Sequence, residues 1–228
     1  MSDARQQIRS GHPLAEHQVK ELLAGYGVSV PARVVLAPGA GDLIPSLPFP
    51  YPVVVKVSDP EILHKTDLGG VRLGIRDEAE LEQALTEMRA RFPGKVLMVE
   101  AQEPPGVEAI VGLIHDPTFG PSVMLGVGGV FTELYQDVAF RVVPITEADA
   151  RDMISQLRAR RLFEGFRGIR ASQEALVSVL CAVSRLAEEL GSYIEQMDLN
   201  PVIVHADRAV VVDAKLRVAD KRTASYGA

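Results

Sequence analysis

Apolar residues along this chain recur at two spacings, one typical of amphipathic helices and the other of strands. Helical spacing predicts four helices, over residues 13–25, 77–92, 146–158 and 172–190. The last three begin at residues that favour helix N-termini, namely Asp77, Thr146 and Ser172. The longest of them carries apolar residues along one face over its whole length, so we expect it to pack against the core.

Short runs of β-branched residues, bounded by glycine and proline, predict the strands. We expect them over residues 28–36 with a break at Pro31, and over 53–56, 71–75, 96–100, 108–114, 123–125, 139–143, 199–204 and 209–213. The turn-rich residues 103–106 favour an antiparallel pair between their two neighbouring strands, and residues 205–208 favour a closing hairpin. Helices and strands do not alternate strictly, so the pattern indicates an α/β protein built of α+β lobes, not a doubly wound sheet.

Composition narrows the class of protein. The length of 228 residues allows one large or two small domains. No run of eighteen apolar residues occurs, and residues 1–12 lack the apolar core of a signal peptide, so we expect a cytoplasmic protein without a membrane span. Cys181 is the single cysteine, which excludes an intrachain disulfide. The net charge is −6 without any basic block, so nucleic-acid binding is not expected.

The segment over residues 51–75 combines three features of a phosphate-binding site. Lys56 places a cation at a strand end, His64 adds an imidazole, and Gly69 with Gly70 forms a turn before the next strand. Glycine lets backbone N–H groups approach an anion, and lysine adds a mobile positive charge. Each residue alone has an ordinary explanation, as a solvated charge, a loop histidine or a hairpin turn. Their combination within one short segment favours the phosphate site.

Two further segments carry groups that suit a nucleoside. Glu100, Ala101 and Gln102 end a predicted strand, where their backbone groups suit the edge of a base. Glu108 begins the next strand, and its carboxylate suits ribose hydroxyls. Taken alone, both glutamates are better explained as ordinary surface carboxylates. The glycine-rich residues 126–130 match neither the Walker pattern nor the dinucleotide-binding pattern.

Oxygen-bearing side chains recur on the two strands of the closing hairpin, at Asp198, Asn200 and Asp213. Mg²⁺ prefers oxygen ligands, usually one or two from the protein and the rest from phosphates and water. Asn200 and Asp213 converge if their strands pair around residues 205–208; a turn start and a plain strand end are the alternative explanations. Arg141 lies on an otherwise apolar strand and suits charge stabilisation at a phosphoryl group.

In combination, nine segments give the chain a recognisable signature. They are PVVVKV, ILHKTDLGGV, VEAQEPPGVEAIVG, DPTFGP, GVGGVFTEL, DVAFRVVPIT, GFRG, DLNPV and VVVDAKL. With them the chain resembles the ATP-grasp subunit of NDP-forming acyl-CoA synthetases, the ADP-forming acetate–CoA ligase family. It is similar, more distantly, to the β subunit of succinyl-CoA synthetase. The resemblance extends from about residue 14 to residue 216.

This resemblance implies an ATP-grasp fold, in which two α+β lobes hold the nucleotide in a cleft between them. The expected organisation is an N-terminal helical segment, an N-terminal lobe, a C-terminal lobe and a tail, over residues 1–27, 28–96, 97–218 and 219–228. The loop before Tyr51 is shorter and richer in proline than the helical spacer usual in the family, so the entrance to the first lobe is expected to differ.

The resemblance also implies a role for each candidate residue. The cofactors would be ATP or ADP with Mg²⁺, and the nucleotide would contact Lys56, Gly69, Gly70, Glu100, Ala101, Gln102 and Glu108. Asn200 and Asp213 would hold the metal. The catalytic residues would be His64 as a phosphohistidine, Arg141 at the transferring phosphoryl group, and Asp198 facing the phosphohistidine loop of a partner.

The implied reaction is acyl-CoA + ADP + phosphate ⇌ carboxylate + CoA + ATP. Because the CoA-binding and ligase domains of the full enzyme are absent from this sequence, we expect a hetero-oligomer with a CoA-binding, α-type subunit. Two alternatives stay open. One is a stand-alone ATP-grasp carboxylate ligase, in which His64 has no required role. The other is a nucleotide-binding regulatory module of an acyltransferase.

Overall fold

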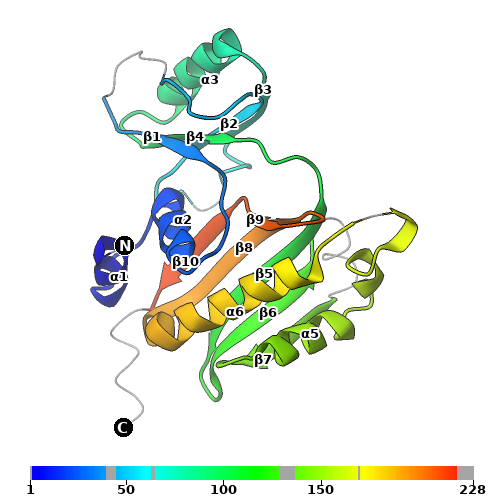
Figure 1. Cartoon of the computed structure of the whole chain (residues 1–228). Helices are drawn as coiled ribbons and strands as arrows, with labels where there is room; N and C mark the ends of the chain where they lie inside the picture. Colours follow the sequence, from blue (N-terminus) through cyan, green and yellow to red (C-terminus); the bar gives the residue numbers. More distant parts are fainter. Residues whose placement is uncertain (1, 40–44, 63–64, 129–136, 169, 220–228) are drawn as a thin grey trace. The chain divides into compact units, whose positions relative to one another are not determined.

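The computed structural model describes residues 2–39, 45–62, 65–128, 137–168 and 170–219 (Figure 1). By their internal contacts the described residues divide into two compact units. Unit 1 comprises the described residues of Met1–Leu14, Gln18–Val30 and Pro105–Ala228, and unit 2 those of Ala15–His17 and Pro31–Pro104. Among the described residues, none of the helices combines the length and the apolar character that crossing a membrane requires.

Unit 2 is built on a four-stranded antiparallel sheet with the order β1-β4-β2-β3. Its strands are β1 (Arg33–Leu36), β2 (Val53–Val57), β3 (Val71–Ile75) and β4 (Leu97–Ala101). The helix α3 (Glu78–Arg91) packs on one face through Leu81, Leu85 and Met88, against the odd-numbered valines of β2. Asp77 caps this helix as predicted, because its Oδ1 accepts a hydrogen bond from the Glu80 N–H at 2.9 Å.

Unit 1 is built on a six-stranded antiparallel sheet with the order β10-β8-β5-β6-β7, in which β9 also pairs with β8. Its strands are β5 (Val107–Asp116), β6 (Gly120–Val127), β7 (Val138–Val142), β8 (Ile194–Val204), β9 (Ala209–Val211) and β10 (Ala214–Val218). Figure 1 shows α5 (Glu147–Gln156) and α6 (Gln173–Leu190) lying along one face of this sheet. Ser172 and Thr146 cap these helices, as predicted.

Unit 1 also contains α1 (Ser2–Arg9) and residues 18–24 of α2 (Glu16–Ala24). Short 3₁₀ turns occupy Arg160–Leu162, Phe166–Gly168 and Gly191–Tyr193. The larger core joins the apolar side of α6 to alternate residues of the sheet, such as Val111, Leu125 and Leu199, which are fully buried. We call the helix-covered side of this sheet its first face and the opposite side its second face.

One strand pairing expected from the sequence was wrong. The strands on either side of residues 103–106 do not pair, because β4 belongs to the sheet of unit 2 and β5 to that of unit 1. Between these two strands, unit 2 ends at Pro104 and unit 1 continues from Pro105. The break expected at Pro31 is confirmed, since Ser29 bridges to Val210 before it, while β1 pairs with β4 after it. Neither α1 nor β10 was predicted.

Candidate functional site

Two acidic and two basic side chains of unit 2 lie close together, and we call them the charge cluster: Glu16, Lys56, Lys65 and Glu100. Lys56 on β2 and Glu100 on β4 share the sheet face opposite to α3, because each lies next to residues whose side chains face that helix. Glu16 is the first residue of α2, and Lys65 lies in the turn before β3. All four are buried, with 1–7% of each residue exposed.

Ion pairs link the four side chains in a row in which acidic and basic groups alternate: Glu100, Lys56, Glu16 and Lys65. The Lys56 ammonium lies 2.9 Å from Glu100 Oε2 and 3.1 Å from Glu16 Oε1. The Lys65 ammonium donates to the other oxygen of Glu16, Oε2. Two cations therefore balance two carboxylates in a place with little water, where removing one member leaves an uncompensated buried charge.

The sequence indicated Lys56 and Glu100 but not Glu16 or Lys65. Glu16 lies 40 positions from Lys56 and 49 from Lys65, so no local pattern connects it with the phosphate segment. Lys65 was visible as the residue after His64, yet a single lysine in a loop is ordinarily solvated. His64 itself lies outside the residues that the structure describes.

The glycine turn holds the chain close to the end of β2. Gly70 N–H donates to the Lys65 carbonyl at 2.6 Å, and the Gly70 carbonyl accepts from Val57 N–H at 2.9 Å. A Cβ atom at Gly70 would lie 2.6 Å from Val57 Cγ1 and 3.1 Å from the Lys65 carbonyl oxygen, so this position requires glycine. Gly69 N–H donates to the Thr66 carbonyl at 3.0 Å. Both glycine N–H groups are thus used within the turn, where the sequence predicted phosphate contacts.

The segment predicted to line a base lies at the end of β4. The N–H groups of Ala101 and Gln102 donate to the carbonyls of Ala32 and Pro52, at 2.9 and 3.0 Å. Gln102 Oε1 accepts from Gly74 N–H at 2.7 Å, which ties the end of β4 to β3. The segment is therefore rigidly placed, and the Glu100 side chain points to Lys56.

In unit 1, the predicted metal ligands lie together as expected. Asn200 N–H donates to the Asp213 carbonyl at 3.2 Å, which places the two residues opposite each other on adjacent chain segments. Asp198 and Asn200 alternate with the buried Met197 and Leu199, so they occupy the second face of the sheet. Asp213 continues the register that pairs Lys215 with Asp198, and side chains of opposed residues share a face.

Burial and two neighbouring charges shift the pKa of Asp198 in this group. Burial raises the pKa of the Asp198 carboxyl above its ordinary value; the positive charge of Lys215 lowers that pKa and the negative charge of Asp213 raises it. Within the described ranges, no group of three or more histidine, cysteine or acidic residues has metal-ligand geometry. One carboxylate and one amide nevertheless fit Mg²⁺, which usually takes one or two ligands from the protein.

Glu108 lies on the same second face, at the start of β5, and is exposed. Its carbonyl accepts a hydrogen bond from Gly128 N–H at 2.7 Å. A Cβ atom at Gly128 would lie 2.7 Å from Glu108 Cβ, so the glycine permits this close approach. Gly128, directly after β6, is thereby attached to the residue predicted to bind ribose.

The structure does not bring Arg141 to this face. Arg141 lies on β7 opposite the buried Val123, and its side chain turns to α5 on the first face of the sheet. There it pairs with the Asp152 carboxylate and lies 3.3 Å from Gln156 Oε1. A role at the transferring phosphoryl group stays a prediction for this residue.

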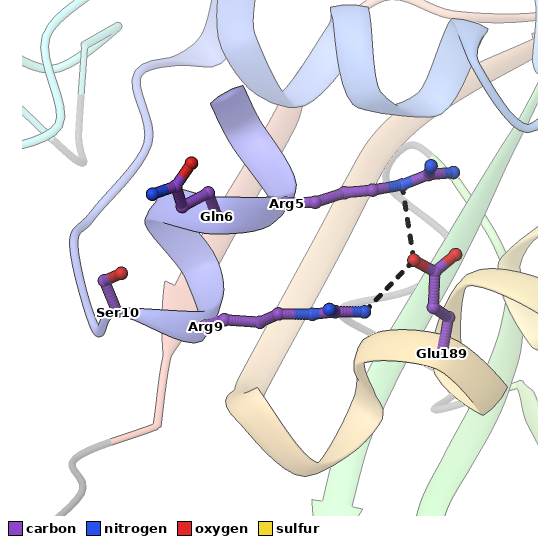
Figure 2. A pocket seen from close by; sticks show the side chains of 5 residues that line it. All are labelled: Arg5, Gln6, Arg9, Ser10 and Glu189. Atoms are coloured by element: carbon purple, nitrogen blue, oxygen red, sulfur yellow. Dashed lines mark hydrogen bonds and ion pairs between the residues drawn. The ribbon is translucent and has the colours of Figure 1, made fainter. Parts of the chain in front are cut away.

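A pocket that the sequence did not indicate lies between α1 and the end of α6 (Figure 2). It is lined by Arg5, Gln6, Arg9, Ser10 and Glu189. Figure 2 shows both arginine side chains extending from α1 to one oxygen of Glu189, at 3.5 Å from Arg5 Nε and 3.3 Å from Arg9 Nη2.

Comparison with known proteins assigns the fold. The sequence matches the ATP-grasp domain over residues 5–218, which is most of its length. The chain belongs to the ATP-grasp family. The fold class predicted from the sequence is thereby confirmed.

The similar curated proteins narrow the family. The chain is 39% identical over 212 residues to the β subunit of acetate–CoA ligase [ADP-forming] I of Pyrococcus furiosus, with 90% of this chain and 91% of that protein covered. It is 33% identical to acetate–CoA ligase [ADP-forming] II of Archaeoglobus fulgidus, over 93% of this chain but only 31% of that longer protein. This ATP-grasp chain is therefore a homologue of the β subunits of ADP-forming acetate–CoA ligases, as the resemblance predicted.

Comparison with solved structures gives the same fold. The dinucleotide-forming acetyl-coenzyme A synthetase 1 of Ca. Korarchaeum cryptofilum, determined with coenzyme A and Mg-AMPPCP, is 37% identical with a TM-score of 0.79, covering 94% of this chain and 97% of that one. An ATP citrate lyase from Methanothrix soehngenii matches at 18% identity with a TM-score of 0.63, covering 91% of this chain and 51% of that one, and supports the fold alone.

Proposed function

We propose that this chain is the nucleotide-binding subunit of an ADP-forming acyl-CoA synthetase. With a CoA-binding partner it would interconvert acyl-CoA, ADP and phosphate with carboxylate, CoA and ATP. The observation that carries the proposal is the pairing of Asn200 with Asp213 beside Asp198 on one sheet face, in a chain that spans 91% of an acetate–CoA ligase β subunit.

Each residue has a physical task in this proposal. Asn200 and Asp213 present two oxygen ligands on one face, and Mg²⁺ held there would neutralise charge on the phosphates. Lys56 would contact nucleotide phosphates, the segment from Glu100 to Gln102 would line the base, and Glu108 would accept from ribose hydroxyls. Within each unit, most of these groups lie on regular strands, which give their side chains defined positions.

The transfer itself would run through His64. A neutral imidazole nitrogen of His64 would form a bond to phosphorus as the bond to the partner's phosphohistidine breaks. The same phosphoryl group would then pass to a terminal phosphate oxygen of ADP, regenerating neutral His64 and giving ATP. Covalent capture divides one transfer between distant sites into two shorter ones. Asp198, whose carboxyl is already costly to ionise, suits a position facing the partner's phosphohistidine loop.

The acid substrate would be selected outside this chain. Homologues over the same region include a 4-hydroxybutyrate–CoA ligase at 33% identity and a trans-feruloyl-CoA synthase at 31% identity. Since the names of these relatives point to acids of very different size, the shared ATP-grasp region is not expected to carry the acid pocket. That pocket would then belong to the CoA-binding partner.

Nucleotide binding is the first test. Mg·ADP at about 100 times its Kd should stabilise the fold by roughly 2.7 kcal/mol, which raises the melting temperature. Asp213→Ala should weaken Mg-dependent binding by about tenfold or more, by comparison with losses at less direct metal contacts. A melting temperature unmoved by saturating Mg·ADP would contradict the proposal, and full Mg-dependent affinity in Asp213→Ala would contradict the metal ligands.

Phosphoryl transfer is the second test. Incubation with labelled ATP and Mg²⁺ should leave acid-labile, base-stable phosphate on the parent chain. His64→Asn should bind Mg·ADP with the parent's affinity but carry no phosphate, because an amide cannot be phosphorylated in this way. ATP formation should require the CoA-binding partner, and light scattering should show a larger complex with it. Full ligase activity from the single chain would support the stand-alone ligase instead.

A further inference from the structure

The two oxygens of Glu16 each bind a different lysine. Oε1 lies 3.1 Å from Lys56 Nζ, and Oε2 accepts from Lys65 Nζ. The three side chains are 3–9% exposed, so water contributes little around them. Two ammonium groups that converge on one small anion make a site that also suits a phosphate group, because lysine acts as a point charge towards either.

The two lysines are held together by the backbone as well as by Glu16. The Lys65 carbonyl accepts from Gly70 N–H at 2.6 Å, and the Gly70 carbonyl accepts from Val57 N–H at 2.9 Å. Val57 directly follows Lys56 on β2. The chain at Lys65 is therefore attached to the strand that carries Lys56 by bonds that do not involve Glu16. If the carboxylate moved away, the two lysines would stay close together.

The charges favour exchange of one anion for another. The cluster contains two lysines and two glutamates, and Lys56 is also paired with Glu100 at 2.9 Å. Without the Glu16 carboxylate, two cations and one carboxylate would remain in a poorly hydrated place. Such an excess of positive charge is most favourably balanced by an incoming anion.

We propose that Lys56 and Lys65 together form the phosphate-binding pair for the nucleotide, and that the Glu16 carboxylate occupies the same position when no nucleotide is bound. The inference rests on the proposed function and adds Lys65 and Glu16 to it. Glu16 acts as a competitor for phosphate, which the bound nucleotide must displace. No covalent bond is made or broken in this exchange. In both states one anion, either the Glu16 carboxylate or a nucleotide phosphate, lies between the two lysines.

The test compares ADP, which has phosphates, with adenosine, which has none. Calorimetric titration with Mg²⁺ present should show that Lys65→Met weakens ADP binding by about tenfold or more, as expected for a lost charged hydrogen bond, with adenosine binding unchanged. Lys65→Arg should retain most of the affinity for ADP. Glu16→Gln should bind ADP several-fold more tightly, because the competing charge is gone. Lys95→Met is the matched control, since Lys95 pairs with Asp59 and Glu61 in the same unit but at the surface.

Circular dichroism confirms that each variant is folded, and the charge-balanced double variant Glu16→Gln/Lys65→Met serves if Lys65→Met unfolds. Loss of ADP affinity in Lys56→Met but not in Lys65→Met or the double variant would overturn this inference and keep the proposed function. An equal loss for ADP and adenosine would assign Lys65 a structural role and overturn it as well. Weaker ADP binding by Glu16→Gln would overturn the competition. If neither lysine variant changed ADP binding, the proposed phosphate contact on β2 would itself fail.

Discussion

In two places among the residues that the structure describes, one glutamate is shared by two cations, once buried and once at the surface. In unit 2, the Glu16 side chain is 3% exposed and binds Lys56 and Lys65. In unit 1, the Glu189 side chain is 36% exposed and binds Arg5 and Arg9. The charges and contacts are alike, and the access of water differs.

The difference in water access changes how strongly each glutamate interacts with its two cations. At the surface, water and salt screen the pair, and a pair of this kind contributes about 0–1 kcal/mol. Glu189 has further neighbours, since the Tyr26 hydroxyl donates to its Oε2 at 2.5 Å and Arg5 lies over the Tyr26 ring. Burial and this hydrogen bond raise the pKa of the Tyr26 hydroxyl, so it stays a donor at neutral pH. In the interior, the carboxylate and the two cations depend strongly on one another, because removing or replacing the anion leaves a buried charge uncompensated.

The largest effect should follow from removing a buried cation. Lys56→Met leaves the carboxylates of Glu16 and Glu100 without their shared partner, and should lower the free energy of unfolding of unit 2 by about 3–5 kcal/mol. The chain has no tryptophan, so urea unfolding is followed by far-ultraviolet circular dichroism.

A charge-balanced variant provides the control for this result. Adding Glu100→Gln to Lys56→Met removes one of the two negative charges that Lys56 balances in the parent chain, and should recover a substantial part of the loss. A loss below about 1 kcal/mol in Lys56→Met would show that the buried cluster behaves like a surface pair.

The sequence revealed the features that depend on neighbouring residues, but not those that depend on tertiary packing. Local signals were sufficient for the capped helices, because Asp77 and Ser172 accept hydrogen bonds from N–H groups three residues away. The meeting of Asn200 with Asp213 was predicted from the hairpin that joins them. Glu16 meets Lys56 and Lys65 only through tertiary packing across at least 40 positions, which no spacing encodes.

Errors in topology have similar causes. Residues 103–106 have the composition of a hairpin turn, yet they connect two sheets, because pairing is decided by which faces each strand buries. The helix α1 was not predicted because only Ala4 and Ile8 of its residues belong to the core. Strand β10 was not predicted because it continues beyond β9 along the same edge of β8, whereas the expected hairpin strand ended at residue 213.

An intermediate effect is expected at Asp198, which is only half-buried. Its pKa is raised in the folded protein, so the folded state binds this proton more tightly than the unfolded chain does. The ionised carboxylate therefore lowers stability above the raised pKa, and this penalty fades as the pH falls to the ordinary value near 4. Asp198→Asn should gain up to about 1 kcal/mol at pH 7, a limit set by its partial exposure and by Lys215 opposite.

The pH dependence distinguishes this effect from a simple packing change. Urea unfolding of the parent and of Asp198→Asn should give converging free energies between about pH 6 and pH 3. If Asp198→Asn were more stable than the parent by the same amount at about pH 6 and at about pH 3, the ionisation of Asp198 would not be the cause of the gain.

The smallest effect is expected at Glu189, and it tests whether burial is the variable that matters. Glu189→Gln keeps the shape of the side chain and a hydrogen-bond acceptor for Tyr26, and removes only the charge between Arg5 and Arg9. The loss of stability should stay below about 1 kcal/mol, and it should shrink further at 0.5 M salt because exposed charges are screened. The matched change in the interior, Glu16→Gln, should be several times larger and insensitive to salt. Equal losses at the two sites would mean that the shared carboxylate, and not its burial, determines the coupling.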